Sequence, residues 1–279
     1  MGSALSVTQM CRALGIERTA IYRPRRASTE HEMALRDAIQ RIALAFTDYG
    51  YRMVTPELRR QGWKVGARRV RRIMREDNLL CHRRRTSWIR YPRHGLPRHP
   101  NLALGFTPSG INQLWVADLT YIRLRMGFVY LAVILDAFSR RGIGWALGMT
   151  LEGELTMAAL RMALARQRPQ LGLIHHSDGG VQYAAYGYVD LLRAHQIRPS
   201  MSRPGRPTDN PACERFIRTL KQGEVYLRDY QDFSDAQRSI ERFIDVVYNH
   251  KRLHSALGYV PPAEFERSLS EPPQSLALT

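Results

Sequence analysis

The sequence predicts an α/β protein in two parts, a basic all-α region followed by a mixed sheet flanked by helices. In the first third of the chain, apolar residues recur at helical spacing between crowded arginines. From Asn112 onward, three runs rich in β-forming residues come first, and helical and strand patterns then alternate. This order favours a mixed sheet covered by helices. The 279 residues are enough to bury a core in each part.

The charge of the chain indicates a polyanionic partner. The formal net charge is +17, so nucleic acid is the first candidate. A membrane surface is the second, but it would need a basic amphipathic helix with a strongly apolar face. The most apolar run, residues 128–135, is too short to span a bilayer, and no signal peptide is recognisable. Three widely spaced cysteines are typical of a reducing compartment, so we expect a cytoplasmic protein.

The basic region divides into two helical segments. Residues 1–27 contain "VTQMCRALGIERTAIYR", which predicts a short helix-turn-helix-like segment with its turn at Gly15. Residues 28–82 predict a helix-turn-helix DNA-binding domain. Within it, "TPELRRQG" predicts a helix capped by Thr55, with Pro56 in its first position.

The last helix of this domain, "GARRVRRIMREDNL", has a basic outer face. Val70, Ile73 and Met74 are expected to point inward. The arginines that are expected to point outward and bind DNA are Arg68, Arg69, Arg71, Arg72 and Arg75. The alternative is a helical bundle whose charges are only solvated.

Residues 83–110 predict a basic linker, because they contain prolines and no sustained period. Its arginines, Arg83, Arg84 and Arg85, are expected to track DNA phosphates without reading bases. A zinc site can be drawn here, but a single cysteine and irregular histidine spacing argue against it. Its ligands would be Cys81, His82, His94 and His99.

Residues 111–230 are predicted to form the core of the α/β part. Strands are expected at "QLWVADLTYIRL", "GFVYLAVILDAF", "GIGWALGMT", "LGLIHHSD" and "IRPSMS", with helices after the third, fourth and fifth. This order is similar to that of a ribonuclease H-like domain, with a mixed five-stranded sheet. Residues 231–279 are expected to form a long helix and a tail that pack on this core.

Three acids in this part are expected to converge. Asp118 lies in the first strand, Asp178 ends the fourth, and Glu214 lies on the helix after the fifth. The first and fourth strands are neighbours in a ribonuclease H-like sheet. Three like charges in a small space need a compensating cation, and oxygen ligands suit Mg²⁺ or Mn²⁺. Two such ions can clamp the attacking and leaving oxygens of a phosphodiester.

Each acid also has a plainer interpretation. Asp118 could face solvent from an edge strand, and Glu214 alone is an ordinary helix glutamate. Asp136 follows an apolar run and is expected to have a structural role with Ser139 or Arg140. Asp209 is expected to be a turn or cap residue. His176, two residues before Asp178, is expected to adjoin the site without being a ligand.

The motifs together identify a family resemblance that covers nearly the whole chain. "LWVADLTYI", "HHSDGGVQY", "DNPACERFIRTLKQGEVY" and "YNHKRLHSALGYVPPAEF" resemble segments of the insertion-sequence-three family transposases, in the product of the second reading frame. "YGYRMVTPELRRQGWKVGARRVRRIMREDNL" looks like their helix-turn-helix segment. The resemblance implies a retroviral integrase-like core with Asp118, Asp178 and Glu214 as catalytic and metal-binding acids. The 35 residues from 179 to 213 are the interval that it implies.

The resemblance also implies partners and one further contact. Lys221 lies seven residues after the glutamate, on the same helix face, and could hold a phosphate; a solvated lysine is the alternative. The family's first reading frame supplies a further DNA-binding domain and a leucine zipper. No sustained heptad occurs in this chain, so we expect a partner protein or a frameshift fusion.

The C-terminal "YNHKRLHSALGYVPP" carries the basic cluster His250, Lys251, Arg252 and His254. It is expected either to pack near the core or to contact DNA.

The function expected from this resemblance is metal-dependent DNA cleavage at transposon ends, followed by strand transfer. The freed 3′-hydroxyl would attack a second phosphodiester in line, without a covalent protein intermediate. The partner is double-stranded DNA, both terminal inverted repeats and target. Because two ends must be held together, a homo-oligomer is expected. The alternatives are a catalytically silent end-binding regulator and a ribonuclease H-like nuclease.

Overall fold

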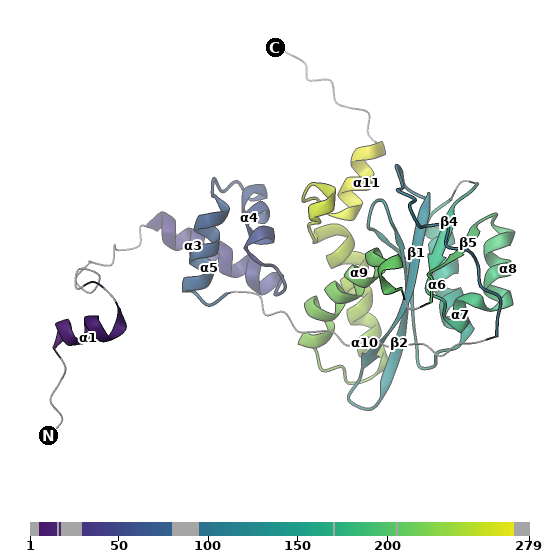
Figure 1. Ribbon diagram of the computed structural model, residues 1–279, viewed down its shortest axis with the longest axis horizontal. Coiled ribbons are helices and arrows are strands. Elements are labelled where there is room, and N and C mark those ends of the chain that lie inside the picture. Colours follow the sequence, from purple (N-terminus) through teal and green to yellow (C-terminus); the bar gives the residue numbers. More distant parts are fainter. Residues whose placement is uncertain are drawn as a thin grey trace, which may run out of the picture.

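The computed structural model describes residues 6–15, 17, 30–79, 95–169, 171–204 and 206–270. It shows a helical unit and an α/β core, the second built on a five-stranded sheet (Figure 1). The mixed sheet with flanking helices confirms the predicted fold class. Of the helices in these ranges, none is both long and apolar enough to cross a membrane.

The first helix, α1 (Val7–Leu14), is capped at both ends by local hydrogen bonds. Ser6 and Gln9 form a capping box at its start. Gly15 ends it in the left-handed conformation, with φ of 64°. The second helix predicted for this segment falls almost entirely outside the described residues, so the helix-turn-helix-like segment stays a prediction.

The helical unit contains α3 (Glu30–Ala45), α4 (Tyr51–Arg60) and α5 (Ala67–Glu76). Its core includes Leu35, Ile39, Val54, Leu58, Val70, Ile73 and Met74. The inward face predicted for α5 is therefore confirmed.

The predicted start of α4 was wrong. The helix begins at Tyr51 after Gly50, and Pro56 lies inside it. Thr55 does not cap a helix; its hydroxyl donates to the Tyr51 carbonyl at 2.7 Å. Burial of Val54 and Leu58 on one face stabilises the earlier turn, although proline removes one backbone donor.

The sheet has the order β3-β2-β1-β4-β5. Its strands are β1 (Leu114–Arg123), β2 (Phe128–Asp136), β3 (Gly142–Gly148), β4 (Ile174–Ser177) and β5 (Arg198–Met201). Strand β1 pairs antiparallel with β2, which pairs antiparallel with β3. Strand β4 pairs in parallel with β1 on one side and with β5 on the other. The centre of the sheet is therefore the β1–β4 pair, where two of the three predicted acids lie.

Helices cover both faces of the sheet (Figure 1). One face packs against α6 (Gly153–Arg166), α7 (Val181–Ala184) and α8 (Tyr186–Ala194). The other packs against α9 (Pro211–Gly223), α10 (Phe233–Glu241) and the π-helix η3 (Arg242–Lys251). The remaining elements are the 3₁₀ turns η1 (Pro207–Asp209), η2 (Val225–Leu227) and η4 (Ser255–Leu257), and helix α11 (Pro262–Ser270). The long helix predicted after residue 231 is thus α10 continued by a π-helix.

Contact between β3 and α6 depends on Gly144. A Cβ at this position would lie 2.3 Å from the Ala159 carbonyl oxygen and 2.8 Å from the Ala163 Cβ. We expect Gly144→Ala to lower the free energy of unfolding by about 1–3 kcal/mol, the range for an overpacked core. Chemical denaturation measures it. Gly153→Ala, where a Cβ meets nothing within 4 Å, is the matched control and should be neutral or slightly stabilising; equal effects would contradict the steric explanation.

The helical unit is joined to the C-terminal segment of the core by polar contacts. The Asp48 carboxylate accepts two hydrogen bonds from the Arg252 guanidinium, at 2.9 and 2.7 Å. The Tyr49 hydroxyl accepts one from the Leu253 amide at 2.8 Å. Arg60 makes a second bidentate pair, with Glu264 on α11. Arg252 therefore packs against protein instead of being presented to DNA.

Part of the predicted linker is also packed on the core. The Leu102 amide donates to the Ser200 hydroxyl at 2.8 Å, and Asn101 donates to Asp209 at 2.9 Å. Leu96 packs beside the α6–α8 core, and Leu102 packs beside the α9–α10 core. The described part of the predicted basic linker therefore packs on the core through partly buried apolar side chains.

Candidate active site

The register of β1 and β4 brings Asp118 beside Asp178. Leu114 pairs with Ile174 and Val116 with His176, both in parallel. Continuing this register by two residues places Asp118 opposite Asp178, just past the end of β4 at Ser177. Neighbouring strands lie about 4.8 Å apart. Because side chains alternate along a strand, Asp118 shares the face of Leu114 and Val116, which α9 covers.

Helix α9 carries Glu214 to this face. The Asn210 side chain, buried just before the helix, donates to the Ala117 carbonyl oxygen at 2.9 Å. Pro211 starts the helix, and Cys213 and Phe216 anchor it in the core. Glu214 lies in the first turn and is half-buried. The start of the glutamate helix is therefore tethered to the backbone residue that precedes Asp118.

Local backbone donors orient both aspartates. An Asp118 carboxylate oxygen accepts from the Leu119 amide at 2.8 Å. An Asp178 carboxylate oxygen accepts from the Gly180 amide at 2.9 Å. A Cβ on Gly180 would lie 2.9 Å from that same oxygen. The second glycine of "SDGG" therefore leaves room for a carboxylate that folds back on its own loop.

The acids perturb one another electrostatically. Burial, together with the charges of Asp178 and Glu214, raises the pKa of Asp118 to about 8, against the opposing effects of the Leu119 amide and Lys221. Burial also raises the pKa of Glu214. The structure thus brings the three predicted acids close enough for their charges to interact. Such a group favours protonation or a cation.

Lys221 is not a solvated surface lysine. Its side chain is half-buried, with the ammonium nitrogen 4.7 Å from the centre of the Tyr121 ring. Burial lowers the pKa of Lys221, and the Asp118 charge opposes that shift. The ammonium group is therefore held on the same side of the sheet as the acids.

The donor set suits a hard divalent cation, since it consists of carboxylate oxygens. Within the described ranges, no three histidine, cysteine, aspartate or glutamate side chains gather closely enough to hold a metal ion. A cation bound among the acids would relieve the repulsion that, together with burial, raises the pKa of Asp118.

The two histidines before Asp178 are engaged by other side chains of the core. The ring nitrogens of His176 contact the hydroxyls of Ser200, at 2.8 Å, and Ser202, at 3.0 Å. His175 points to the other face and contacts the Tyr188 hydroxyl at 3.0 Å. Burial lowers the pKa of His176 to about 4, so it is neutral at physiological pH. His176 is a buried neighbour of the acids.

The two other acids have structural contacts. Asp136 accepts from the amides of Ser139, Phe138 and Asn112, which confirms the expected structural role with Ser139. Asp209 lies in the turn before α9, where Arg203 binds its carboxylate and holds its pKa well below the usual range. It does more than an isolated turn residue, because it fixes the loop that leads to Glu214.

The predicted DNA-binding arginines of α5 are not equivalent. Arg72 pairs with Glu76 at 2.9 Å and with Glu32 at 3.4 Å, and Arg69 approaches Glu32 at 3.8 Å. Arg71 lies over the Tyr51 ring. Arg68 and Arg75 are exposed and have no ion pair among the described residues. Arg83, Arg84 and Arg85, and three of the four residues in the zinc alternative, lie outside those residues.

Three contributors to the site were missed from the sequence. Asn210 tethers α9, and Tyr121 lies under Lys221. The guanidinium of Arg98 packs against Gly179, where a Cβ would lie 1.9 Å from its nitrogen. The signals available in the sequence were Asn210, which directly precedes Pro211, and Arg98, which lies in the predicted linker. Neither reveals its partner without the fold.

The burial of Asp118 and its repulsion by the other acids predict a stability effect. In the metal-free protein, the pKa of Asp118 is about 8 in the folded state and near 4 when unfolded. Folding stability is therefore lost as the pH rises from about 4 to 8. Asp118→Asn removes this loss, and we expect its melting temperature at pH 8 to exceed that of the unaltered protein by about 2–4 °C, equivalent to ~1 kcal/mol. Thermal scans in chelator measure it; an advantage that does not shrink toward pH 4 would contradict the explanation.

The fold defines an integrase-type catalytic core with an attached helical unit. The family model described as "Integrase core domain" matches residues 108–207, and a second model of that description matches 195–262. A model described as "HTH-like domain" matches residues 30–86. The fold resembles that of a chain in the cryo-EM structure of the simian T-cell lymphotropic virus intasome in complex with PP2A regulatory subunit B56 gamma. That match has a TM-score of 0.50 at 17% identity, covering 87% of this chain and 79% of that one.

Whole-chain relatives specify the family. Transposase InsF for insertion sequence IS3A of Escherichia coli (strain K12) is 34% identical, covering 94% of each chain. The "Insertion element IS600 uncharacterized 31 kDa protein" of Shigella sonnei is 37% identical, covering 92% of this chain and 97% of that protein. The chain therefore belongs to the IS3 family of transposases. It is a DNA transposase, a polynucleotidyl transferase with an integrase-like core.

Proposed function

We propose that the protein cleaves DNA at transposon ends in a divalent-metal-dependent reaction and transfers the freed 3′-hydroxyl to target DNA. The observation that carries this proposal is the β1–β4 register, which sets Asp118 opposite Asp178 on the face covered by the Glu214 helix. The like-charge coupling of the acids supports a cation-binding role. Both steps, cleavage at the transposon end and attack of the freed 3′-hydroxyl on target DNA, would use this same set of acids.

In this mechanism, the three acids hold the cations and the basic groups hold the phosphate. Asp118 and Asp178 would bind the ions between them, and Glu214 would complete the second position. Two Mg²⁺ or Mn²⁺ ions, when bound, activate the attacking oxygen and stabilise the departing one. Lys221, held over Tyr121, would bind a non-bridging phosphate oxygen beside the scissile bond. The Asn210–Ala117 hydrogen bond keeps Glu214 in register with Asp118.

The direct test is a cleavage assay on labelled duplexes that carry the ends of the element encoding this chain. We expect nicking with Mg²⁺ or Mn²⁺, no nicking in chelator, and joined products when target DNA is present. Binding to the ends without metal-dependent nicking would favour a silent end-binding regulator. Cutting of RNA–DNA hybrids in preference to these ends would favour a ribonuclease H-like nuclease.

The helical unit is proposed to bind DNA through the exposed arginines of α5. Replacing Arg68 and Arg75 together by Gln is expected to weaken binding and reduce the salt dependence of the binding constant by about one unit per lost phosphate contact. Arg72→Gln is the matched comparison on the same helix, and should have a smaller effect because Glu76 and Glu32 already engage Arg72. Fluorescence anisotropy across a salt series measures both. A larger effect for Arg72→Gln would contradict this division of roles.

Assembly is also proposed, since transposition must hold two ends and a target. The proposed complex is a homo-oligomer on DNA in the bacterial cytoplasm, with the first-reading-frame protein of the same element or a frameshift fusion to it. Size measurement of the protein with and without end DNA tests the oligomer. If a single protein chain were found on a complex that holds two DNA ends, the proposed homo-oligomer would be excluded.

A further inference from the structure

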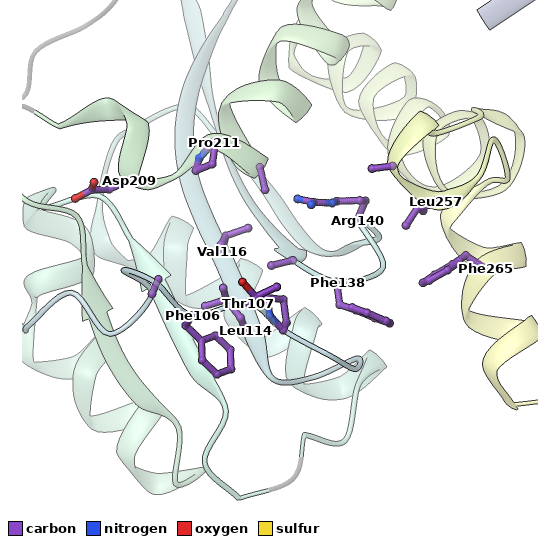
Figure 2. A pocket seen from close by; sticks show the side chains of 15 residues that line it. Phe106, Thr107, Leu114, Val116, Phe138, Arg140, Asp209, Pro211, Leu257 and Phe265 are labelled. Atoms are coloured by element: carbon purple, nitrogen blue, oxygen red, sulfur yellow. The ribbon is translucent and has the colours of Figure 1, made fainter.

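A pocket of about 340 Å³ opens on the α9 face of the sheet, beside the proposed active site. Val116 forms its floor, Pro211 and Ala212 of α9 form one wall, and residues from the β2–β3 turn and α11 form the other. Figure 2 shows Arg140 extending from that turn into the space between Pro211 and Leu257. The pocket is mostly apolar and contains one guanidinium group.

Arg140 is held in this position by a strained backbone. Its φ is +63°, a region that non-glycine residues rarely adopt. Its amide donates to the Asp136 carbonyl, and the Asp136 carboxylate holds the rest of the turn. In the described parts of the chain, the guanidinium makes no hydrogen bond or ion pair with another side chain. Strain that is kept at a residue with an unused charged group points to a ligand for that group.

The charged and titratable groups around Arg140 leave room for an anion. Arg215 and Tyr248 lie close enough to affect its charge, as does Asp136, whose carboxylate is already bound by backbone amides. Asp209 also lines the pocket, but Arg203 and Asn101 occupy its oxygens. A planar guanidinium with free donors matches a phosphate, which it can bind through two parallel hydrogen bonds.

The walls suit a nucleobase. Phe138 and Phe265 lie with ring centres 5.5 Å apart, and Phe106 lines the opposite side of the pocket (Figure 2). Aromatic faces hold bases of any sequence by stacking. The volume lies at the low end for small-molecule pockets, so it fits one nucleotide and excludes a base pair.

The pocket adjoins the acids along two elements. Val116 precedes Asp118 by two residues, a distance of about 7 Å along a strand. Ala212 precedes Glu214 by two residues in the same helical turn. A nucleotide in the pocket would therefore neighbour the phosphodiester held by the acids.

We propose that this pocket binds one unpaired nucleotide next to the scissile phosphate, with Arg140 on its phosphate and the phenylalanine rings on its base. The inference rests on the proposed strand-transfer function, which it deepens by naming a subsite. The strained turn fixes the guanidinium before DNA arrives. An unpaired base held in the pocket would fix which phosphodiester lies at the acids. The position of the cut would then depend on opening of the duplex at the transposon end.

The test is photo-crosslinking with the full chain carrying Asp118→Asn, so that no strand is cut. The probe is a duplex with a short single-stranded 3′ arm that carries 5-iododeoxyuridine at one arm position at a time. We expect one position to crosslink to peptides containing Phe106, Phe138 or Phe265. Adding Arg140→Gly should lower that crosslink at least about tenfold, the factor for losing even one of the two charge-assisted hydrogen bonds. Crosslinks that map only elsewhere would overturn the proposal.

The matched control separates ligand binding from backbone strain. Gln196 has φ of +57° in an exposed turn after α8, so Gln196→Gly relieves similar strain without removing a guanidinium. We expect neither glycine variant to melt below the parent, and only Arg140→Gly to lose the crosslink. If Arg140→Gly and Arg140→Gln both melt at clearly lower temperature, Arg140 supports the fold and the proposal fails. If the unaltered protein cuts normally but no crosslink maps to the pocket, the nucleotide subsite is contradicted and the proposed function is not. If crosslinks map to the pocket but no metal-dependent cutting occurs, the proposed function is contradicted and nucleotide binding by the pocket is not.

Discussion

Asp118→Asn protein is expected to bind transposon-end DNA normally and to lose strand cleavage by at least about a thousandfold, equivalent to roughly 4 kcal/mol of transition-state stabilisation. Asparagine keeps the shape and the hydrogen bond from Leu119 but cannot supply the negative charge that a cation needs. Asp178→Asn and Glu214→Gln should behave alike, because the proposed metal sites use all three charges. Single-turnover cleavage of labelled ends, with anisotropy for binding, measures both quantities.

The control for these variants is an aspartate of similar chemistry far from the acids. Asp190 lies exposed on α8, on the opposite face of the sheet, near Arg193 at 3.7 Å. Asp190→Asn should cut at the unaltered rate. If Asp178→Asn still cut and joined end-containing DNA, the assignment of the acids would be wrong. If binding were lost together with cutting, the acids would belong to a DNA-binding surface and not to the chemistry.

The fold was predictable where local sequence and burial agree. The apolar run of residues 128–135 forms a buried strand, β2, as expected, because most of its side chains are buried on both faces of the sheet. The start of α4 was not predictable from local signals, since Thr55 and Pro56 are good starting residues yet lie within the helix. Packing of Val54 and Leu58 decided that case. Local propensity is a weak guide wherever tertiary burial opposes it.

The candidate acids could be named from the sequence, but their geometry could not. The order strand, strand, helix, together with the family resemblance, was enough to propose Asp118, Asp178 and Glu214. That Asp118 faces Asp178 depends on a parallel register between segments separated by the whole of β2, β3 and α6. The tether from Asn210 to Ala117 joins residues 93 apart. A pattern in one sequence cannot supply such a pairing, because many partners satisfy the same local chemistry.

The C-terminal basic cluster shows the same limit. The sequence left it between core packing and DNA contact. In the structure, Asn249 exchanges two hydrogen bonds with the backbone of Gly142, and Arg252 reaches Asp48 in the helical unit. Tyr248 stacks edge-on with His254 and Phe216. The segment thus connects the sheet to the helical unit, and if that unit binds DNA as proposed, the segment would set the distance between DNA and the acids.

That role predicts a large effect for Arg252→Ala. The Arg252 and Asp48 side chains are only 11% and 7% exposed, so removing the cation leaves a buried, unpaired carboxylate. Breaking such a pair costs about 3–5 kcal/mol. We expect a lower melting temperature and faster proteolysis between the helical unit and the core. The three acids themselves are unaltered, so the core should keep its capacity for cleavage. Differential scanning calorimetry and limited proteolysis measure these effects.

The double variant decides whether the ion pair or the surrounding packing is responsible. Asp48→Leu combined with Arg252→Met removes both charges and keeps most of the volume, so it should recover to within about 1 kcal/mol of the unaltered protein. Arg60→Ala is the exposed comparison; its pair with Glu264 is over 40% exposed on both sides and should contribute less than about 1 kcal/mol. If the recovered double variant binds ends and cuts them at the unaltered rate, docking alone fixes the geometry. If it is as unstable as Arg252→Ala, the contact of Arg252 with the Tyr49 ring, at 5.1 Å, holds the units together instead of its charge pair.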